Sequence, residues 1–161
     1  EETGFHLACD NGCTDIAKLI LDFSKENGGI ELNARNDSGK TPFYLACECD
    51  RPEIAKLMLD FAKENGGIDL NARDEDGETG FHCACLYGNQ ETVKLLLRNW
   101  KESGIDIKTQ DIEGQTALDV LRLNYKNGRN EVVTMLEEEY SRIDDSEPAF
   151  KKHKKERKKC F

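Results

Sequence analysis

Thr79-Gly80-Phe81-His82-Cys83-Ala84-Cys85 recurs along this 161-residue chain, and its recurrence indicates the fold. Near-copies stand at Thr3-Gly4-Phe5-His6-Leu7-Ala8-Cys9 and Thr41-Pro42-Phe43-Tyr44-Leu45-Ala46-Cys47, and a fainter copy at Thr116-Ala117-Leu118-Asp119-Val120-Leu121-Arg122. The leading threonines are 38, 38 and 37 residues apart. Self-similarity at a fixed period of this size predicts an architecture of stacked repeats.

Each copy opens a unit that predicts two helices. The threonine suits the N-cap, where its oxygen accepts a hydrogen bond from the first turn, and Pro42 suits the first helical position. Apolar residues follow at helical spacing, and Gly12 and Gly88 are expected to stop the first helix. A second apolar run and a glycine-containing turn complete the unit. The order is therefore helix, turn, helix and hairpin loop.

This pattern resembles the ankyrin repeat. The run from Asp74 to Ala84 matches the family motif closely, and Gly88 and the three leucines at 95–97 fall in register. The resemblance covers residues 3–140 and implies an all-α ankyrin-repeat solenoid of helix-turn-helix units joined by hairpin loops. We expect a repeat domain over 1–142, with units at about 1–35, 36–73, 74–110 and 111–142. An acidic linker and a basic, disordered tail would follow over 143–161.

The chain departs from the usual ankyrin pattern in several places. Its units have 37–38 residues, whereas ankyrin units usually have about 33. The extra residues at 22–27 and 60–65 predict a second helix about one turn longer than usual. Glycine or alanine replaces the family's proline in three units, and Asp50-Arg51-Pro52 replaces a glycine turn. Gly128 comes late in the fourth unit, which predicts about three extra residues in its first helix or following turn.

The sequence lacks the segments and motifs of several classes of protein. No apolar run is long enough to span a bilayer, and no signal-peptide pattern is present. The chain has no phosphate-binding glycine loop, HExxH, GxSxG or EF-hand pattern. His6 and His82 occupy the family's Thr-x-x-His position, where the ring is expected to bond the neighbouring backbone. We therefore expect no enzyme activity, no catalytic residues and no cofactor.

The seven cysteines predict packed thiols rather than a metal site or disulfides. Cys9, Cys47 and Cys85 each stand six residues after their threonine, where the ankyrin pattern favours a small residue. Equivalent positions in stacked units are expected about 10 Å apart, beyond the roughly 7 Å limit for a disulfide. The Cys-x-Cys spacing is not that of zinc ribbons. Unpaired thiols indicate a reducing compartment, so we expect the cytoplasm or nucleus.

The resemblance also predicts a partner-binding surface, since ankyrin folds typically bind through the hairpin tips and the exposed side of the first helices. Seven of its residues are acidic and one is basic, while Leu86, Tyr87 and Ile112 are expected to lie close together. Such a surface favours a protein partner of basic character and no small-molecule substrate. The predicted surface comprises Asp10, Asn11, Asp37, Ser38, Lys40, Glu48, Cys49, Glu75, Asp76, Glu78, Leu86, Tyr87, Ile112, Glu113 and Gln115.

The C-terminal tail has the opposite charge. It carries seven positive and one negative side chain, a net +6, so the rest of the −9 chain carries −15. It could be a nuclear-import signal, a contact for nucleic acid or acidic lipid, or a plug for the acidic surface. A solubilising tail or a linker is the plainer alternative. The basic residues are Lys151, Lys152, Lys154, Lys155, Arg157, Lys158 and Lys159.

The sequence therefore favours a protein-interaction module, a scaffold or adaptor that presents a rigid surface. The first unit lacks a hairpin of its own, so we expect a longer native protein. The alternative is accordingly a regulatory or targeting piece of a larger enzyme or channel. A further hypothesis concerns Asn33 and Asn71, which stand in Leu-Asn-Ala runs of the type that is hydroxylated in ankyrin hairpins.

Overall fold

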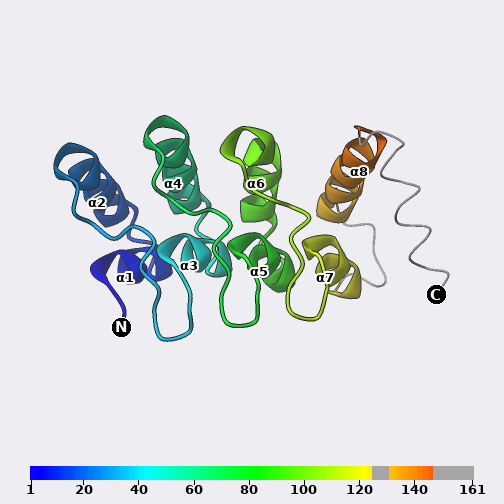
Figure 1. Cartoon of the computed structure of the whole chain (residues 1–161), viewed down its shortest axis with the longest axis horizontal. Helices are drawn as coiled ribbons and strands as arrows, with labels where there is room; N and C mark the ends of the chain where they lie inside the picture. The colour runs from blue at the N-terminus through cyan, green and yellow to red at the C-terminus, as the bar shows by residue number, and fades with distance from the viewer. Residues whose placement is uncertain (125–130, 147–161) are drawn as a thin grey trace, which may run out of the picture.

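The computed structural model describes residues 1–124 and 131–146, and within them the chain forms helices and loops with two isolated β-bridges, Arg73 to Thr79 and Gln110 to Thr116. Figure 1 shows two parallel rows of helices, with the hairpins projecting beyond the row of shorter helices. The predicted all-α solenoid is confirmed. The shorter helices are α1 (Gly4–Asp10), α3 (Pro42–Glu48), α5 (Gly80–Tyr87) and α7 (Ala117–Asn124). The longer helices are α2 (Thr14–Asn27), α4 (Pro52–Asn65), α6 (Gln90–Ser103) and α8 (Glu131–Ser146).

Thr3, Thr41 and Thr79 cap the first three short helices as predicted. Each hydroxyl accepts a hydrogen bond from the backbone N–H three residues later, and Pro42 occupies the first turn of α3. In α1 and α5 the histidine at that third position also accepts from the threonine N–H, which completes a capping box.

The extra residues of the long units lie in the second helices. Residues 22–27 and 60–65 form the ends of α2 and α4, so the predicted extension is helical. Gly28 and Gly66 follow them with φ values of 67° and 71°, which a glycine adopts without strain. In the fourth unit α8 runs to Ser146, so the first residues of the expected linker are helical. The expected insertion near Gly128 lies outside the described residues.

The core is a stripe shared by neighbouring units. Each short helix packs on the next short helix and each long helix on the next long helix, while the two helices of a unit pack together. One cluster of buried side chains runs from Phe5 in α1 to Leu136 in α8. The predicted packing of Cys9, Cys47 and Cys85 is confirmed, since all three are fully buried in this cluster.

The turn after α3 replaces glycine with aspartate. Gly12 and Gly88 lie in the left-handed region, and Asp50, at the equivalent position, has φ 51°. It is the only residue other than glycine with positive φ among the described residues. Its carboxylate accepts a hydrogen bond of 2.8 Å from the hydroxyl of Thr92, which is buried in α6. This bond gives the strained turn a compensating contact with the next unit.

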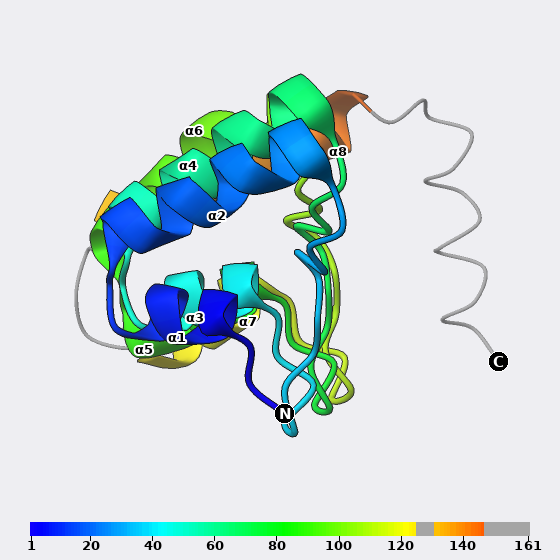
Figure 2. The ribbon, with the colours of Figure 1, turned by 90° about the vertical axis from the view of Figure 1, so that its left-hand side faces the viewer.

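The hairpins extend to one side of the helix rows, so the molecule has an L-shaped profile in Figure 2. Arg73 links successive hairpins, because its guanidinium donates to the carbonyls of Gly77 and Gln110. Asn71 donates to the carbonyl of Gly104 and accepts from the N–H of Asp106. Asn33 makes the equivalent pair of bonds with Gly67 and Asp69. These contacts hold the hairpins at a fixed spacing beside the short helices.

Candidate partner-binding groove

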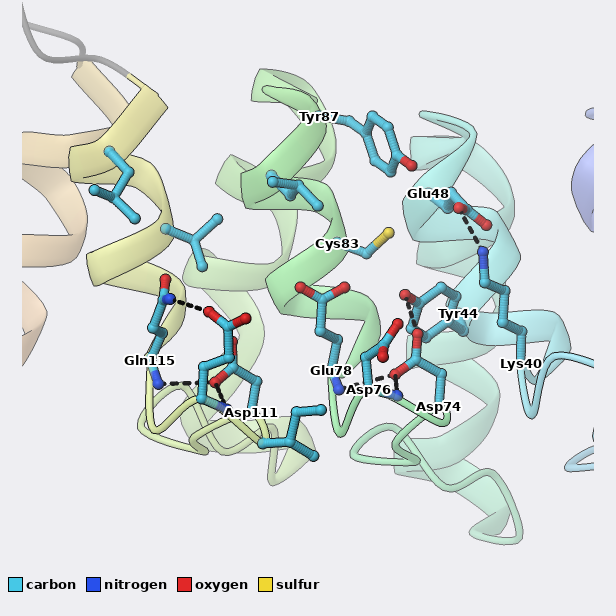
Figure 3. A pocket seen from close by; sticks show the side chains of 15 residues that line it. Lys40, Tyr44, Glu48, Asp74, Asp76, Glu78, Cys83, Tyr87, Asp111 and Gln115 are labelled. Carbon is cyan, nitrogen blue, oxygen red and sulfur yellow. Dashed lines mark hydrogen bonds and ion pairs between the residues drawn. The ribbon is translucent and has the colours of Figure 1, made fainter.

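A groove with a volume of about 530 Å³ lies where α3, α5 and α7 meet the hairpins that precede α5 and α7 (Figure 3). Six of its side chains are carboxylates and one is an ammonium group. We call this set of residues the acidic groove. Its lining comprises Lys40, Tyr44, Glu48, Asp74, Asp76, Glu78, Cys83, Leu86, Tyr87, Asp111, Ile112, Glu113, Gln115, Val120 and Leu123.

Two of the carboxylates hold the hairpins. Asp74 accepts hydrogen bonds from the N–H groups of Asp76 and Glu78. Asp111 accepts the equivalent pair from Glu113 and Gln115. An aspartate that bonds the backbone two residues ahead stabilises a tight turn. These two side chains are therefore structural as well as charged.

Tyr44 and Cys83 form the floor beside Asp74. Tyr44 stands at the histidine position of its unit, and its hydroxyl donates to the second oxygen of Asp74 at 2.7 Å. Burial, followed by the neighbouring Cys83 and Asp74, raises the pKa of Tyr44. Burial also raises the pKa of Cys83 to about 12, so the thiol stays protonated at neutral pH. The floor is neutral and its side chains are fixed.

Lys40 does not neutralise the groove. Its ammonium lies 2.7 Å from a Glu48 oxygen and sits over the ring of Tyr44 at 5.2 Å from the centroid. Burial lowers the pKa of Lys40, but the hydrogen bond and charge of Glu48 outweigh burial and the net shift is upward. The cation is therefore paired at one edge, and the charge facing the rest of the groove stays negative.

Glu78 lies among other carboxylates of the acidic groove. Burial raises the pKa of its carboxyl, and repulsion from Asp74, Asp111 and Asp76 raises it further, against an opposing effect of Lys40. Within the described residues, no hydrogen bond or ion pair engages the carboxylates of Asp76 and Glu78. A cation positioned between them would lower the energy of both carboxylates.

Four further lining side chains are apolar or aromatic and are exposed. Leu86 is 40% and Tyr87 61% exposed on α5, Leu123 is 53% exposed on α7, and Ile112 is 70% exposed on a hairpin tip. Monomeric proteins scatter single apolar residues over the surface, but these four line one groove. The groove therefore combines an acidic strip along the hairpins with apolar anchors along the helices.

The groove brings together nine residues of the predicted surface and leaves six outside it. Those inside are Lys40, Glu48, Asp76, Glu78, Leu86, Tyr87, Ile112, Glu113 and Gln115. Among those outside, Asp10 accepts a hydrogen bond from Cys49 while its carbonyl binds Arg51. Asn11 bonds the carbonyl of Leu7, at the end of α1. Asp37, Ser38 and Glu75 stand on hairpins beyond the groove lining.

Six lining residues escaped the sequence reasoning: Tyr44, Asp74, Cys83, Asp111, Val120 and Leu123. Repeat position is the signal that could have found two of them. Leu123 stands seven residues after its threonine, as Glu48 and Leu86 do, and Val120 shares the position of Cys83. Asp74 and Asp111 stand where Asn36 opens the preceding hairpin. Tyr44 becomes a lining residue because a phenol reaches further than an imidazole.

His6 and His82 belong to the capping boxes of α1 and α5. His6 accepts the Thr3 N–H on Nδ1, so Nε2 carries the proton and donates to the carbonyl of Lys40 at 3.0 Å. The predicted tie between loop and helix is confirmed there. Burial lowers the pKa of His82, against the opposing charge of Asp111. Its Nε2 atom is buried and makes no hydrogen bond within the described residues. His153 and the basic tail lie outside the described residues.

Residues 1–124 and 131–146 contain no group of three or more histidine, cysteine, aspartate or glutamate side chains that could hold a metal ion. No helix in these ranges is long and apolar enough to cross a membrane.

Comparison with family models identifies the repeat. A model described as ankyrin repeats (3 copies) matches residues 1–74, and a second, described as ankyrin repeats (many copies), matches residues 62–121. The chain belongs to the ankyrin-repeat family. Ankyrin repeats generally mediate protein–protein interaction, and the family is typically non-catalytic. A search of curated proteins found no match.

Proposed function

We propose that this ankyrin array is a protein-interaction module whose acidic groove binds an extended partner segment that carries lysine or arginine beside an apolar side chain. The observation that carries the proposal is the composition of the groove. Unpaired carboxylates at Asp76 and Glu78 stand beside exposed Leu86, Tyr87 and Ile112. Apolar and aromatic anchors supply most of the binding energy at such surfaces, and complementary charge supplies specificity and speed of association.

The rigidity of the groove supports the same function. Hydrogen bonds of Asp74 and Asp111 fix both hairpins, and Tyr44 ties the first of them to α3. A surface that is already ordered spends little conformational entropy on binding, so the cost falls on the partner. The negative field would accelerate encounter with a basic segment, and this effect would weaken as salt rises.

A peptide-display selection tests the proposal. Random twelve-residue peptides would be selected on residues 1–161 and their affinities measured on two double variants. Asp76→Lys with Glu78→Lys reverses two groove charges without removing the aspartates that hold the hairpins. Asp22→Lys with Glu26→Lys makes the same change in net charge on α2, away from the groove.

We expect enriched peptides to combine basic and apolar residues. They should bind the α2 control as they bind the parent, and bind the groove variant at least about tenfold more weakly at low salt. Enriched peptides without basic residues, or equal loss in both variants, would refute the assignment. Repeating the measurement on residues 1–148 separates the groove from the basic tail.

A further inference from the structure

The acidic groove opens beside the helix from which the C-terminal segment leaves. Residues 149–161, here called the basic tail, lie outside the described residues and follow α8, which ends at Ser146. The hydroxyl of Tyr140 in α8 donates to the carbonyl of Ile107, four residues before Asp111 of the groove. Six of the fifteen lining residues belong to the same last unit as α8: Asp111, Ile112, Glu113, Gln115, Val120 and Leu123.

The basic tail is long enough to enter this groove. Six helical residues separate Tyr140 from Ser146, which amounts to about 9 Å along α8. The backbone from Ile107 to Asp111 adds at most about 14 Å, so the path from Ser146 through the Tyr140 side chain to Asp111 is about 35 Å. The 13 residues from Ser146 to Lys159 can span about 43 Å when extended. The last basic residues therefore reach the groove without any movement of the described residues.

The charges of the two parts are opposite and similar in size. The groove has six carboxylates and one ammonium group, a net −5, and residues 151–159 carry a net +6. Phe161 follows Lys159 by two residues, and in an extended segment such a pair points to the same side. The basic tail thus offers cations beside an aromatic ring, the combination that suits the carboxylates and the exposed apolar side chains of the groove.

The acidic helix α8 lies nearer to the basic tail, but several of its carboxylates already have cationic partners. Glu137 lies 2.8 Å from the guanidinium of Arg122, and Glu139 lies 3.3 Å from the ammonium of Lys101. A further cation gains little from a carboxylate that is already paired. The two carboxylates of the acidic groove that make no ion pair within the described residues are therefore the more favourable site for the charges of the tail.

We infer that the basic tail occupies the acidic groove of its own chain when no partner is bound. The cations at 154–159 then lie over the carboxylates, and Phe161 lies against the exposed apolar side chains. This inference rests on the proposed function, since it names an occupant of the same site. A tethered segment competes at an effective concentration of about 1 mM, so a partner has to displace the tail and only stronger basic partners bind.

Carbodiimide cross-linking of residues 1–161 tests the contact, because the reagent joins an amine directly to a carboxylate. We expect cross-links from the lysines at 154–159 to Asp76, Glu78 or Glu113, identified by mass spectrometry. The exposed carboxylates of Asp22 and Glu26 on α2 are the internal control and should react less. The groove cross-links should fall at least about fivefold in 1 M salt, where screening acts beyond about 3 Å.

Cross-links that fall mainly on α2 or α8 would overturn the inference. A mixture of ¹⁴N- and ¹⁵N-labelled protein shows whether the cross-links form within one chain. Cross-links between differently labelled chains would also overturn it, because the tail of a second copy would then be the occupant.

The affinity of groove-selected peptides gives a second readout. A tail variant with Lys155→Gln, Lys158→Gln and Lys159→Gln is compared with a control that carries Lys18→Gln, Lys25→Gln and Lys56→Gln. The control makes the same change in net charge at exposed positions of α2 and α4. We expect the tail variant to bind the peptides at least about threefold more tightly than the control, because its own tail competes less.

The two readouts separate this inference from the proposed function. Equal peptide affinities for the tail variant and the control would overturn the inference and leave the proposed function standing. If the display experiment enriches no peptide, the proposed function fails. The cross-links then decide by themselves whether the tail lies in the groove.

Discussion

Replacing Gly80 by alanine should destabilise the protein, although alanine is normally the better residue in a helix. Gly80 is the first residue of α5 and faces α3. A Cβ atom at this position would lie 3.1 Å from Sγ and 3.2 Å from Cβ of Cys47, and 3.3 Å from Cα of Tyr44. Gly4 is the equivalent residue of α1 and has no atom within 4 Å of such a Cβ.

Whether Gly80→Ala stabilises or destabilises the protein depends on two opposing effects. Replacing glycine by alanine at an unstrained helical position gains about 0.4–1 kcal/mol, mainly by restricting the unfolded chain. Overpacking a close contact costs about 1–3 kcal/mol. Cys47 is fully buried and the Tyr44 atom belongs to the backbone, so neither can move aside easily. We expect Gly80→Ala to lose about 1 kcal/mol and Gly4→Ala to gain about 0.5 kcal/mol.

Urea unfolding of the two variants measures the difference. A double-mutant cycle with Cys47→Ala identifies its source, because removing Sγ relieves the closest contact. Gly80→Ala should then cost about 0.5–1 kcal/mol less in the Cys47→Ala background than in the parent. Equal stabilisation by Gly80→Ala and Gly4→Ala would refute the reasoning, since α3 and α5 could not approach each other as described.

Three further perturbations follow from the same contacts. Asp50→Gly should lower the free energy of unfolding, measured in urea, by about 1 kcal/mol. The lost hydrogen bond to Thr92 outweighs the strain that glycine relieves in the left-handed backbone. Asp50→Asn keeps a hydrogen-bond acceptor, so its stability should change little. Asn71→Ala should lower the free energy of unfolding by about 1–2 kcal/mol, because it removes both hydrogen bonds that Asn71 makes to the next hairpin. Unchanged stability would contradict this role. Glu78→Gln should raise stability at pH 7, because a carboxyl whose pKa is raised on folding destabilises the folded state once it ionises. Parent and variant should converge below the unfolded pKa of about 4.3, and an equal difference at pH 3 and pH 7 would contradict this origin.

The placement of hairpin side chains explains which parts of the groove the sequence could predict. Glu78, Leu86 and Ile112 were found by repeat position alone, since equivalent positions face the same side of a solenoid. Asp74 and Asp111 were missed because the predicted surface was taken from the exposed hairpin tips. The sequence does not show that an aspartate that holds a turn can also face the groove. Asp10 stands at the repeat position of Leu86, and Glu75 stands at the repeat position of Ile112, yet both lie outside the groove lining. The bounds of the domain and of the tail stay predictions.

The repeat, the capped short helices and the longer second helices could all be predicted from the amino-acid sequence. These features depend on local hydrogen bonds and apolar spacing, which are properties of consecutive residues. The folded structure was needed to show which carboxylates hold hairpins and which stay unpaired. It also showed that Glu48 neutralises Lys40 and that Gly80 has no room for a side chain. It also distinguished the exposed Ile16 from the buried Ile54, residues of the same type at the same repeat position. The physical reason is that burial and pairing depend on what the neighbouring unit places opposite a residue, and that neighbour lies about 38 residues away.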